Sequence, residues 1–277
     1  MEDYNEDQFI IDQFTYSFSK LNSYYHCGHE FHRRYIECES PEASFFTEYG
    51  SYVHKILEMY YNNELTLFEL SSYYEEHFDE NIQHNPPPNK YVDLRMTYYQ
   101  KGLDFFDNII DFDFDKYEIL GVEKKINFTI AEKKFVGFID LLIREKETGN
   151  IIMQDHKSAS IKFLKNGQPS KKDVEHVLEF KRQQYLYSIA IKEEYKMFPK
   201  VLQWNLFKDR FLYQIDFDEK EYNDSIKWAE ETIALISKEC MWLPDNSNFF
   251  YCNYLCGFRN AACDYKAVYV KQTEEGE

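Results

Sequence analysis

The chain has 277 residues, of which 44% are hydrophobic and 18% aromatic, so it can form one large or two small domains, and general disorder is excluded. Lys and Arg number 32 against 49 Asp and Glu, and this net charge of −17 does not suit a protein that coats nucleic acid nonspecifically. No apolar run approaches the roughly 18 residues of a membrane span, and the acidic N-terminus is unlike a signal peptide. We therefore expect a cytoplasmic protein without membrane association.

The first part of the chain predicts helices. Apolar and aromatic residues recur at helical spacing over residues 18–37, where a serine cap opens the pattern, and again over 45–64. Two more amphipathic stretches lie between residues 64 and 116, and the turn NPPPNK separates them because its prolines cannot continue a helix.

From residue 117 onward the pattern changes to β-branched and aromatic residues with short polar turns. This pattern predicts strands over 117–130, 133–145, 150–158, 200–207 and 211–217, and helices over 174–195 and 221–239. We find no internal repeat, linker or clear domain boundary. The order of elements predicts one α/β domain over residues 1–277, with helical segments at its start.

The second and third predicted strands are joined by the turn KETG, whose glycine is free to adopt a positive φ. Closing Glu145 on Asn150 makes the numbers of paired residues sum to 295. This register places Asp140 opposite Asp155 on one face of the sheet, and a shift of one residue would destroy the pairing.

The same face carries a third charged residue. Asp155 and Lys157 are two positions apart on a strand, so their side chains leave the same face. Together with Asp140, they can hold a divalent cation and place an ammonium beside it, which is the equipment for activating water against a phosphodiester. The alternative is an ion pair on an exposed sheet. His54 lies one helical turn after Gly50 and can complete such a site, although a lone helical histidine is more often a surface or core residue.

The ordered segments YGSYVH, VEKKINF, GFID, QDHK and QQYLY resemble the RecB-type branch of the PD-(D/E)XK nuclease superfamily. This branch includes the nuclease domains of the RecB and AddB helicase-nucleases and the small CRISPR-associated RecB-like exonucleases. The resemblance spans roughly residues 14–265. It implies an N-terminal helical part over about 14–116 and a restriction-endonuclease-like core, a central mixed sheet flanked by helices, over about 117–240.

The resemblance also assigns roles to individual residues. The implied metal ligands, for Mg²⁺ or Mn²⁺, are His54, Asp140 and Asp155. The implied catalytic residues are Asp140, Asp155, Lys157, Gln183 and Tyr187. Glu123 matches an acidic position on the strand before GFID.

The cysteines give a second signal. The same resemblance implies that a 4Fe-4S cluster is held by Cys27, Cys252, Cys256 and Cys263. The last three lie in a Cys-rich C-terminal segment, about 241–265, that we call the clasp. The spacing of these three departs from the family pattern, so zinc in a four-thiolate site, or unliganded buried thiols, are the alternatives. Two further cysteines, Cys38 and Cys240, are expected to be packed thiols.

These features predict a metal-dependent deoxyribonuclease, with single-stranded DNA ends as the substrate that the resemblance favours. Residues 157–182 contain seven Lys or Arg and three Asp or Glu, which is either a solvated face or a track for the DNA backbone. The residues expected to contact DNA are Lys162, Lys165, Lys171, Lys172, Lys181 and Arg182. No Walker motif is present, so any ATP-driven unwinding requires a separate helicase. The rival functions are a catalytically inactive module that binds DNA ends or a helicase, and a zinc-stapled interaction module.

Overall fold

The computed structural model describes residues 6–245, 247–260 and 263. The chain divides into two compact units. The unit that we call the sheet unit comprises Phe45–Phe128 and Val136–Ile226, and the terminal unit comprises Met1–Ser44, Thr129–Phe135 and Lys227–Glu277. Because one domain can contain two compact units, the expected single domain over residues 1–277 stays a prediction.

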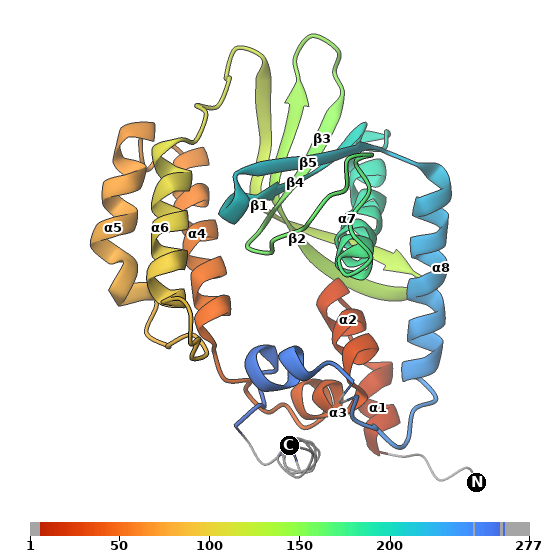
Figure 1. The fold of residues 1–277 in the computed structure, drawn as a ribbon. Helices are drawn as coiled ribbons and strands as arrows, with labels where there is room; N and C mark the ends of the chain where they lie inside the picture. Colours follow the sequence, from red (N-terminus) through yellow and green to blue (C-terminus); the bar gives the residue numbers. More distant parts are fainter. Residues whose placement is uncertain (1–5, 246, 261–262, 264–277) are drawn as a thin grey trace, which may run out of the picture. The chain divides into compact units, whose positions relative to one another are not determined.

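The protein contains a five-stranded mixed sheet (Figure 1). Its strands, in spatial order, are β1 Tyr117–Ile130, β2 Lys133–Glu145, β3 Ile151–Lys157, β4 Val201–Leu206 and β5 Phe211–Asp216. The pairs β2–β3 and β4–β5 are antiparallel, whereas β3–β4 is parallel. The parallel pair requires a crossover connection, which contains helix α7 Val174–Tyr195. The predicted α/β class with a mixed sheet is confirmed.

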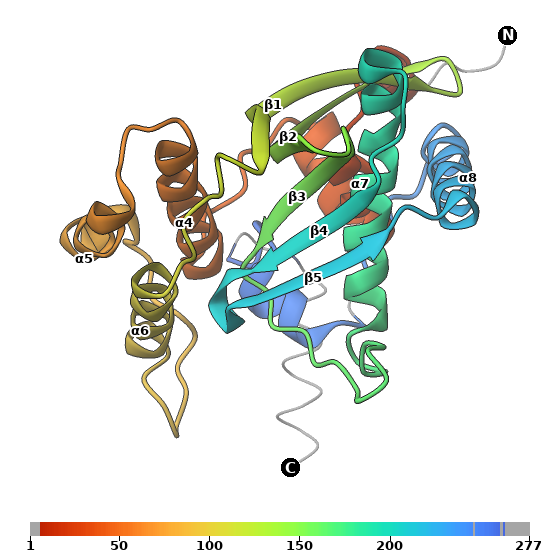
Figure 2. The ribbon, with the colours of Figure 1, turned by 90° about the horizontal axis from the view of Figure 1, so that it is seen from above.

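Three helices of the sheet unit cover one face of the sheet, and α7 covers the other (Figure 2). The first three are α4 Phe45–Tyr61, α5 Leu70–Asn81 and α6 Leu94–Asp107. Their aromatic residues form a buried core with sheet residues such as Leu141, Ile143 and Ile152. On the opposite face, Gln184 of α7 donates to the carbonyl oxygen of Gln203 on β4 at 2.6 Å. The sheet is therefore buried on both faces, as a parallel pair generally requires.

The terminal unit contains short helices, the turn between β1 and β2, and the later part of α8. Its elements are α1 Glu6–Asp12, α2 Phe18–His26, α3 Gly28–Phe31, η1 His32–Ile36 and η4 Tyr251–Leu255, together with α8 Glu219–Ile236, which begins in the sheet unit. Its core is aromatic: Phe31 stacks on Trp242 with ring centroids 5.5 Å apart. The short turns η2 Leu67–Glu69 and η3 Phe207–Asp209 belong to the sheet unit.

The expected continuous helix over residues 18–37 is wrong. Ser17 caps the start of α2 as expected, but the backbone is extended at Cys27, where φ is −164° and ψ is 110°. The Sγ atom of Cys27 then accepts a hydrogen bond from the backbone N–H of Glu30, which begins a new helix. Helical periodicity continues across this position, so the pattern alone did not reveal the break.

No helix in the described part of the chain combines the length and hydropathy of a membrane span.

Candidate active site

The site forms where strands β2 and β3 stop pairing. Their ladder ends at Leu141 opposite Gln154, in the predicted register, and the turn closes with Glu145 N–H donating to the Asn150 carbonyl at 2.9 Å. The glycine of this turn, at residue 149, has the expected positive φ of 74°.

Beyond that ladder, a side chain replaces the strand carbonyl. The Oδ2 atom of Asp140 accepts a hydrogen bond from the backbone N–H of His156 at 2.6 Å. Asp140 and Asp155 are only 8% and 6% exposed, so two carboxyl groups are buried together. This arrangement brings the predicted acids into one site.

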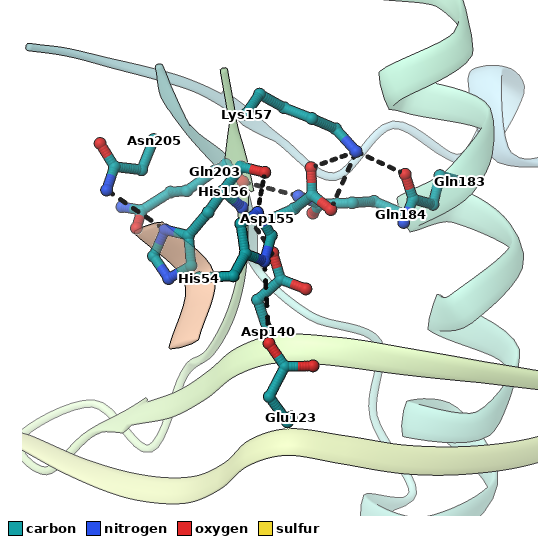
Figure 3. Close-up of polar contacts among 10 residues, drawn as sticks. All are labelled: His54, Glu123, Asp140, Asp155, His156, Lys157, Gln183, Gln184, Gln203 and Asn205. Carbon is teal, nitrogen blue, oxygen red and sulfur yellow. Dashed lines mark hydrogen bonds and ion pairs between the residues drawn. The ribbon is translucent and has the colours of Figure 1, made fainter. Parts of the chain in front are cut away.

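His54 reaches the site from helix α4 (Figure 3). Its Nε2 atom lies 2.8 Å from the backbone carbonyl oxygen of His156, so Nε2–H donates to that oxygen. In this tautomer the lone pair of Nδ1 is free, and Nδ1 lies 3.5 Å from Asp140 Oδ2. One ring nitrogen therefore fixes the orientation of His54, and the other is available to a metal ion.

Glu123 of β1 completes a group of three metal-ligating side chains. Its Oε1 atom lies 3.8 Å from His54 Nδ1, and one ligand atom each from His54, Glu123 and Asp140 lie within 4.8 Å of one another. The backbone of Glu123 has a φ of 44°, in the left-handed region that a non-glycine residue rarely adopts. Such backbone strain is typical of functional sites.

Asp155 is directed toward Lys157 rather than toward this group. The Nζ atom of Lys157 lies 3.2 Å from Asp155 Oδ1 and 2.9 Å from Oδ2, and it donates to Gln183 Oε1 at 2.9 Å. The ammonium also lies 5.2 Å from the centroid of the Phe180 ring. Gln183 thus holds the lysine in place, and the assignment of Asp155 as a metal ligand stays a prediction.

Tyr187 follows Gln183 by one helical turn but forms part of the wall of the site. It is 7% exposed, and its ring lies so close to Gly137 that a Cβ there would come within 2.5 Å of the ring. Burial raises the pKa of its hydroxyl. Gly137 is therefore required for close packing, and the role of Tyr187 in catalysis stays a prediction.

Burial and neighbouring charges change the protonation of the site. Burial, together with the nearby Asp155, raises the pKa of Asp140 to about 7. Burial alone would lower the pKa of His54, but its contact with Glu123 and the charges of Asp140 and Asp155 raise it overall. Asp140 thus retains a proton in a large fraction of molecules near neutral pH, and a cation would displace it.

His156 contributes its backbone to the site and its side chain to the core. Its imidazole is buried and lies parallel to the ring of Tyr61, with centroids 6.1 Å apart. Asn205 Nδ2 lies 3.2 Å from its Nδ1. The ring points to the face of β3 opposite that of Asp155 and Lys157, as strand alternation predicted.

The residues expected to contact DNA form two groups. Lys181 and Arg182 are half-buried on α7 and pair with Glu221 at 2.8 Å and Glu175 at 3.5 Å. The other group, in the loop between β3 and α7, is exposed and consists of Lys162, Lys165, Lys171 and Lys172. Only the second group presents its charges openly.

The four cysteines of the expected cluster all line one pocket of the terminal unit. None of them forms a disulfide bond. Backbone N–H groups donate to two of the sulfur atoms, from Glu30 to Cys27 Sγ and from Phe258 to Cys256 Sγ, both at 3.4 Å. Burial raises the pKa of Cys256 to about 12. The pocket therefore brings Cys27 together with three cysteines from the other end of the sequence.

The expectation for the remaining two cysteines is wrong. Cys38 and Cys240 are exposed rather than packed. Cys38 follows η1 in a turn with a φ of 56°, and Cys240 follows the end of α8. Both lie just past the end of a helix, where the side chain has no helix face to pack on.

Three comparisons bear on the family of the chain. The family model of the PD-(D/E)XK nuclease superfamily matches residues 15–267. A solved structure of a candidate exonuclease from Eubacterium rectale has a similar fold, with a TM-score of 0.51, 11% sequence identity, and coverage of 96% of this chain and 91% of that chain. No curated protein matches the chain.

Proposed function

The chain belongs to the PD-(D/E)XK nuclease superfamily, and we propose that it is a metal-dependent exonuclease that degrades DNA from single-stranded ends. The main support is the convergence of His54, Asp140, Asp155 and Lys157 at the point where β2 and β3 stop pairing. A site without catalytic function has no physical reason to bury two carboxyl groups beside a lysine, because each buried charge costs free energy. This argument disfavours the rival of an inactive binding module.

The side chains at the site suit a divalent cation. His54 Nδ1 and the carboxylates of Glu123 and Asp140 can approach one ion from three elements, α4, β1 and β2. Carboxylate oxygens bind Mg²⁺ and Mn²⁺, and an imidazole ligand makes Mn²⁺ especially acceptable. When bound, the cation supplies positive charge that polarises the phosphate and lowers the pKa of a bound water.

The contacts of Lys157 support a role in the chemical step. Asp155 and Gln183 fix its ammonium from two sides. A fixed ammonium can orient the attacking water and offset the charge that develops on the phosphate oxygens, with little reorganisation during the reaction. The exposed lysines between β3 and α7 follow Lys157 directly in sequence and can bind the DNA backbone.

A cleavage assay tests this function. Labelled single-stranded and double-stranded DNA are incubated with the protein and Mg²⁺, Mn²⁺ or a chelator, and the Lys157→Ala variant is the control. We expect metal-dependent shortening of the single strand from its ends, and none with the variant. Equal cleavage by the variant would show that the assignment of Lys157 is wrong, and binding without cleavage would support the inactive module. Addition of a helicase tests whether the duplex becomes a substrate once it is unwound.

We also propose that the cysteine pocket holds a 4Fe-4S cluster that staples the clasp. Four thiols in one pocket are the complement that such a cluster requires, and N–H groups directed at Cys27 and Cys256 stabilise thiolates. Burial, and then repulsion from the neighbouring cysteines, raises the pKa of Cys252. Binding of the thiolates to a cluster would remove this repulsion.

Iron and sulfide analysis of protein prepared without air tests this cluster. We expect brown protein that is bleached when any one of the four cysteines is replaced by Ser. The Cys38→Ser and Cys240→Ser variants are matched controls, because both cysteines are exposed and lie outside the pocket. Colourless protein with bound zinc would establish the zinc alternative, and absence of both metals would leave only free thiols.

A further inference from the structure

A chain of aromatic rings extends from the core of the sheet unit to its surface. Trp204 stacks on Tyr213 with centroids 5.3 Å apart, and Tyr213 contacts Phe163 at 4.8 Å. Phe163 contacts Phe211 at 5.3 Å. The inner ring, Trp204, is fully buried, whereas Phe211 is 44% exposed. The outer rings thus form an apolar surface that no described residue covers completely.

This surface lies on the catalytic face of the sheet. Lys157 is opposite Leu206 in the β3–β4 ladder, and Leu206 is opposite Phe211 in the β4–β5 ladder. Directly opposed residues point to the same face, and neighbouring strands are about 4.8 Å apart, so Phe211 lies about 10 Å from Lys157 across the sheet. The exposed ring of Phe211 is therefore within reach of nucleotides next to the bond that is cut.

Phe163 is held by an ordered arm, residues 161–170, that follows the catalytic lysine. Backbone bonds from Leu164 N–H to Gln168 O at 2.8 Å and from Ser170 N–H to Lys162 O at 2.7 Å pair its two sides. Asp173 fixes its base by accepting from Lys162 N–H at 3.2 Å. The arm is thus a small hairpin rather than an irregular loop, and it presents Leu164, 48% exposed, near its tip.

The charge around the arm indicates the partner. Exposed lysines lie on the arm and just after it, at 162, 165, 171 and 172, in a chain with a net charge of −17. The exposed ring of Phe211 and the half-buried ring of Phe163, beside lysines, suit a single nucleic-acid strand, because unpaired bases stack on aromatic rings while lysines contact phosphates. In a duplex the bases are already stacked on one another and cannot reach the rings. An apolar protein partner would leave the positive charge unexplained.

We propose that Phe163, Leu164 and Phe211 form a shelf on which bases of a single DNA strand stack beside the catalytic site. This inference rests on the proposed nuclease function and deepens it, because the shelf would make the enzyme prefer unpaired DNA. The shelf gives binding energy through the faces of the bases, so it discriminates little between base sequences.

Binding measurements on a cleavage-deficient Lys157→Ala background test the shelf. Fluorescence anisotropy compares a short oligo-dT, an abasic strand of the same length and a short duplex. Loss of one stacking ring is expected to weaken oligo-dT binding about 5- to 100-fold for Phe211→Ala, with little change for the abasic strand. Tyr91→Ala is the matched control, because Tyr91 is a 92% exposed aromatic residue elsewhere in the sheet unit.

A second variant keeps the test valid if Phe211→Ala disturbs the edge strand. Phe211→Trp retains a stacking ring, and its emission should be quenched by oligo-dT but not by the abasic strand. Unchanged oligo-dT affinity in Phe211→Ala, equal losses for both strands, or absence of quenching in Phe211→Trp would each overturn the shelf. In those cases a parent protein that still cuts single strands leaves the nuclease function intact. A parent that neither binds nor cuts DNA would overturn both.

Discussion

The buried carboxyl group of Asp140 makes a quantitative prediction about pH and stability. Its pKa is raised from 3.8 to about 7 in the folded, metal-free protein, chiefly by burial and then by Asp155. The folded state therefore binds more protons than the unfolded state between these values. The free energy of unfolding must then fall as the pH rises from about 4 to about 7, and this penalty stays constant above pH 7.

The substitution Asp140→Asn removes this penalty while preserving shape. The amide oxygen can still accept the hydrogen bond from His156 N–H, but the side chain cannot ionise. Each pKa unit corresponds to about 1.4 kcal/mol, so the difference of about 3 units amounts to about 4 kcal/mol. This figure is an upper limit, because the substitution also removes an attraction that raises the pKa of His54.

Urea denaturation in the presence of a chelator, from pH 4 to pH 8, measures the effect. We expect Asp140→Asn to match the parent near pH 4 and to exceed its stability by up to about 4 kcal/mol at pH 8. Excess Mn²⁺ at 100 times its Kd should narrow this difference by up to about 2.7 kcal/mol, because the cation stabilises the parent and binds less tightly to the variant, which has lost a ligand. The exposed Asp224→Asn is the control. A difference that does not change with pH would refute the reasoning.

Three further substitutions probe the site. Lys157→Ala should lower the cleavage rate at least about 100-fold while DNA affinity in anisotropy stays within a few-fold; full activity would remove the lysine from the mechanism. His54→Ala should raise the Mn²⁺ concentration needed for half-maximal cleavage by about 10-fold or more, so high Mn²⁺ should partly restore the rate. An unchanged metal dependence would contradict the role of His54 as a ligand. Gly137→Ala should lower the free energy of unfolding in urea by about 1–3 kcal/mol, because the added Cβ would come within 2.5 Å of the Tyr187 ring. Gly50→Ala is the control and should cost nothing, because the nearest neighbour of a Cβ there is 3.7 Å away. Equal stability of the two variants would count against the packing argument.

The sheet was largely predictable because local chemistry determines it. The strands over 117–130 and 133–145 have the predicted bounds, since alternation and the polar turns between strands are both local signals. The KETG turn then sets the register of β2 and β3, and that register places Asp140 beside Asp155. The acids could be paired from sequence because the hairpin that joins them is short.

The break at Cys27 could not be predicted from local pattern. Leu243 approaches closely from the other end of the chain, where a Cβ on Gly28 would lie 3.0 Å from the Leu243 carbonyl oxygen. This contact depends on tertiary packing, so the helical periodicity of residues 18–37 cannot indicate it. Glu123 is a similar case: the left-handed backbone that accompanies its position in the site has no signature in the residue type, because a non-glycine residue is not expected there.

The central residue of the segment Asp155–Lys157 shows how main-chain groups help to build the candidate site. The backbone N–H of His156 binds Asp140, and its backbone carbonyl orients His54. Two side chains of the candidate site, from other elements, are therefore aligned by main-chain groups, which every residue except proline supplies in full. The side chain at this position needs only to fill the core against Tyr61. The chemistry of the site thus constrains Asp155, Lys157 and the strand register. Packing constrains His156, which lies between these two residues.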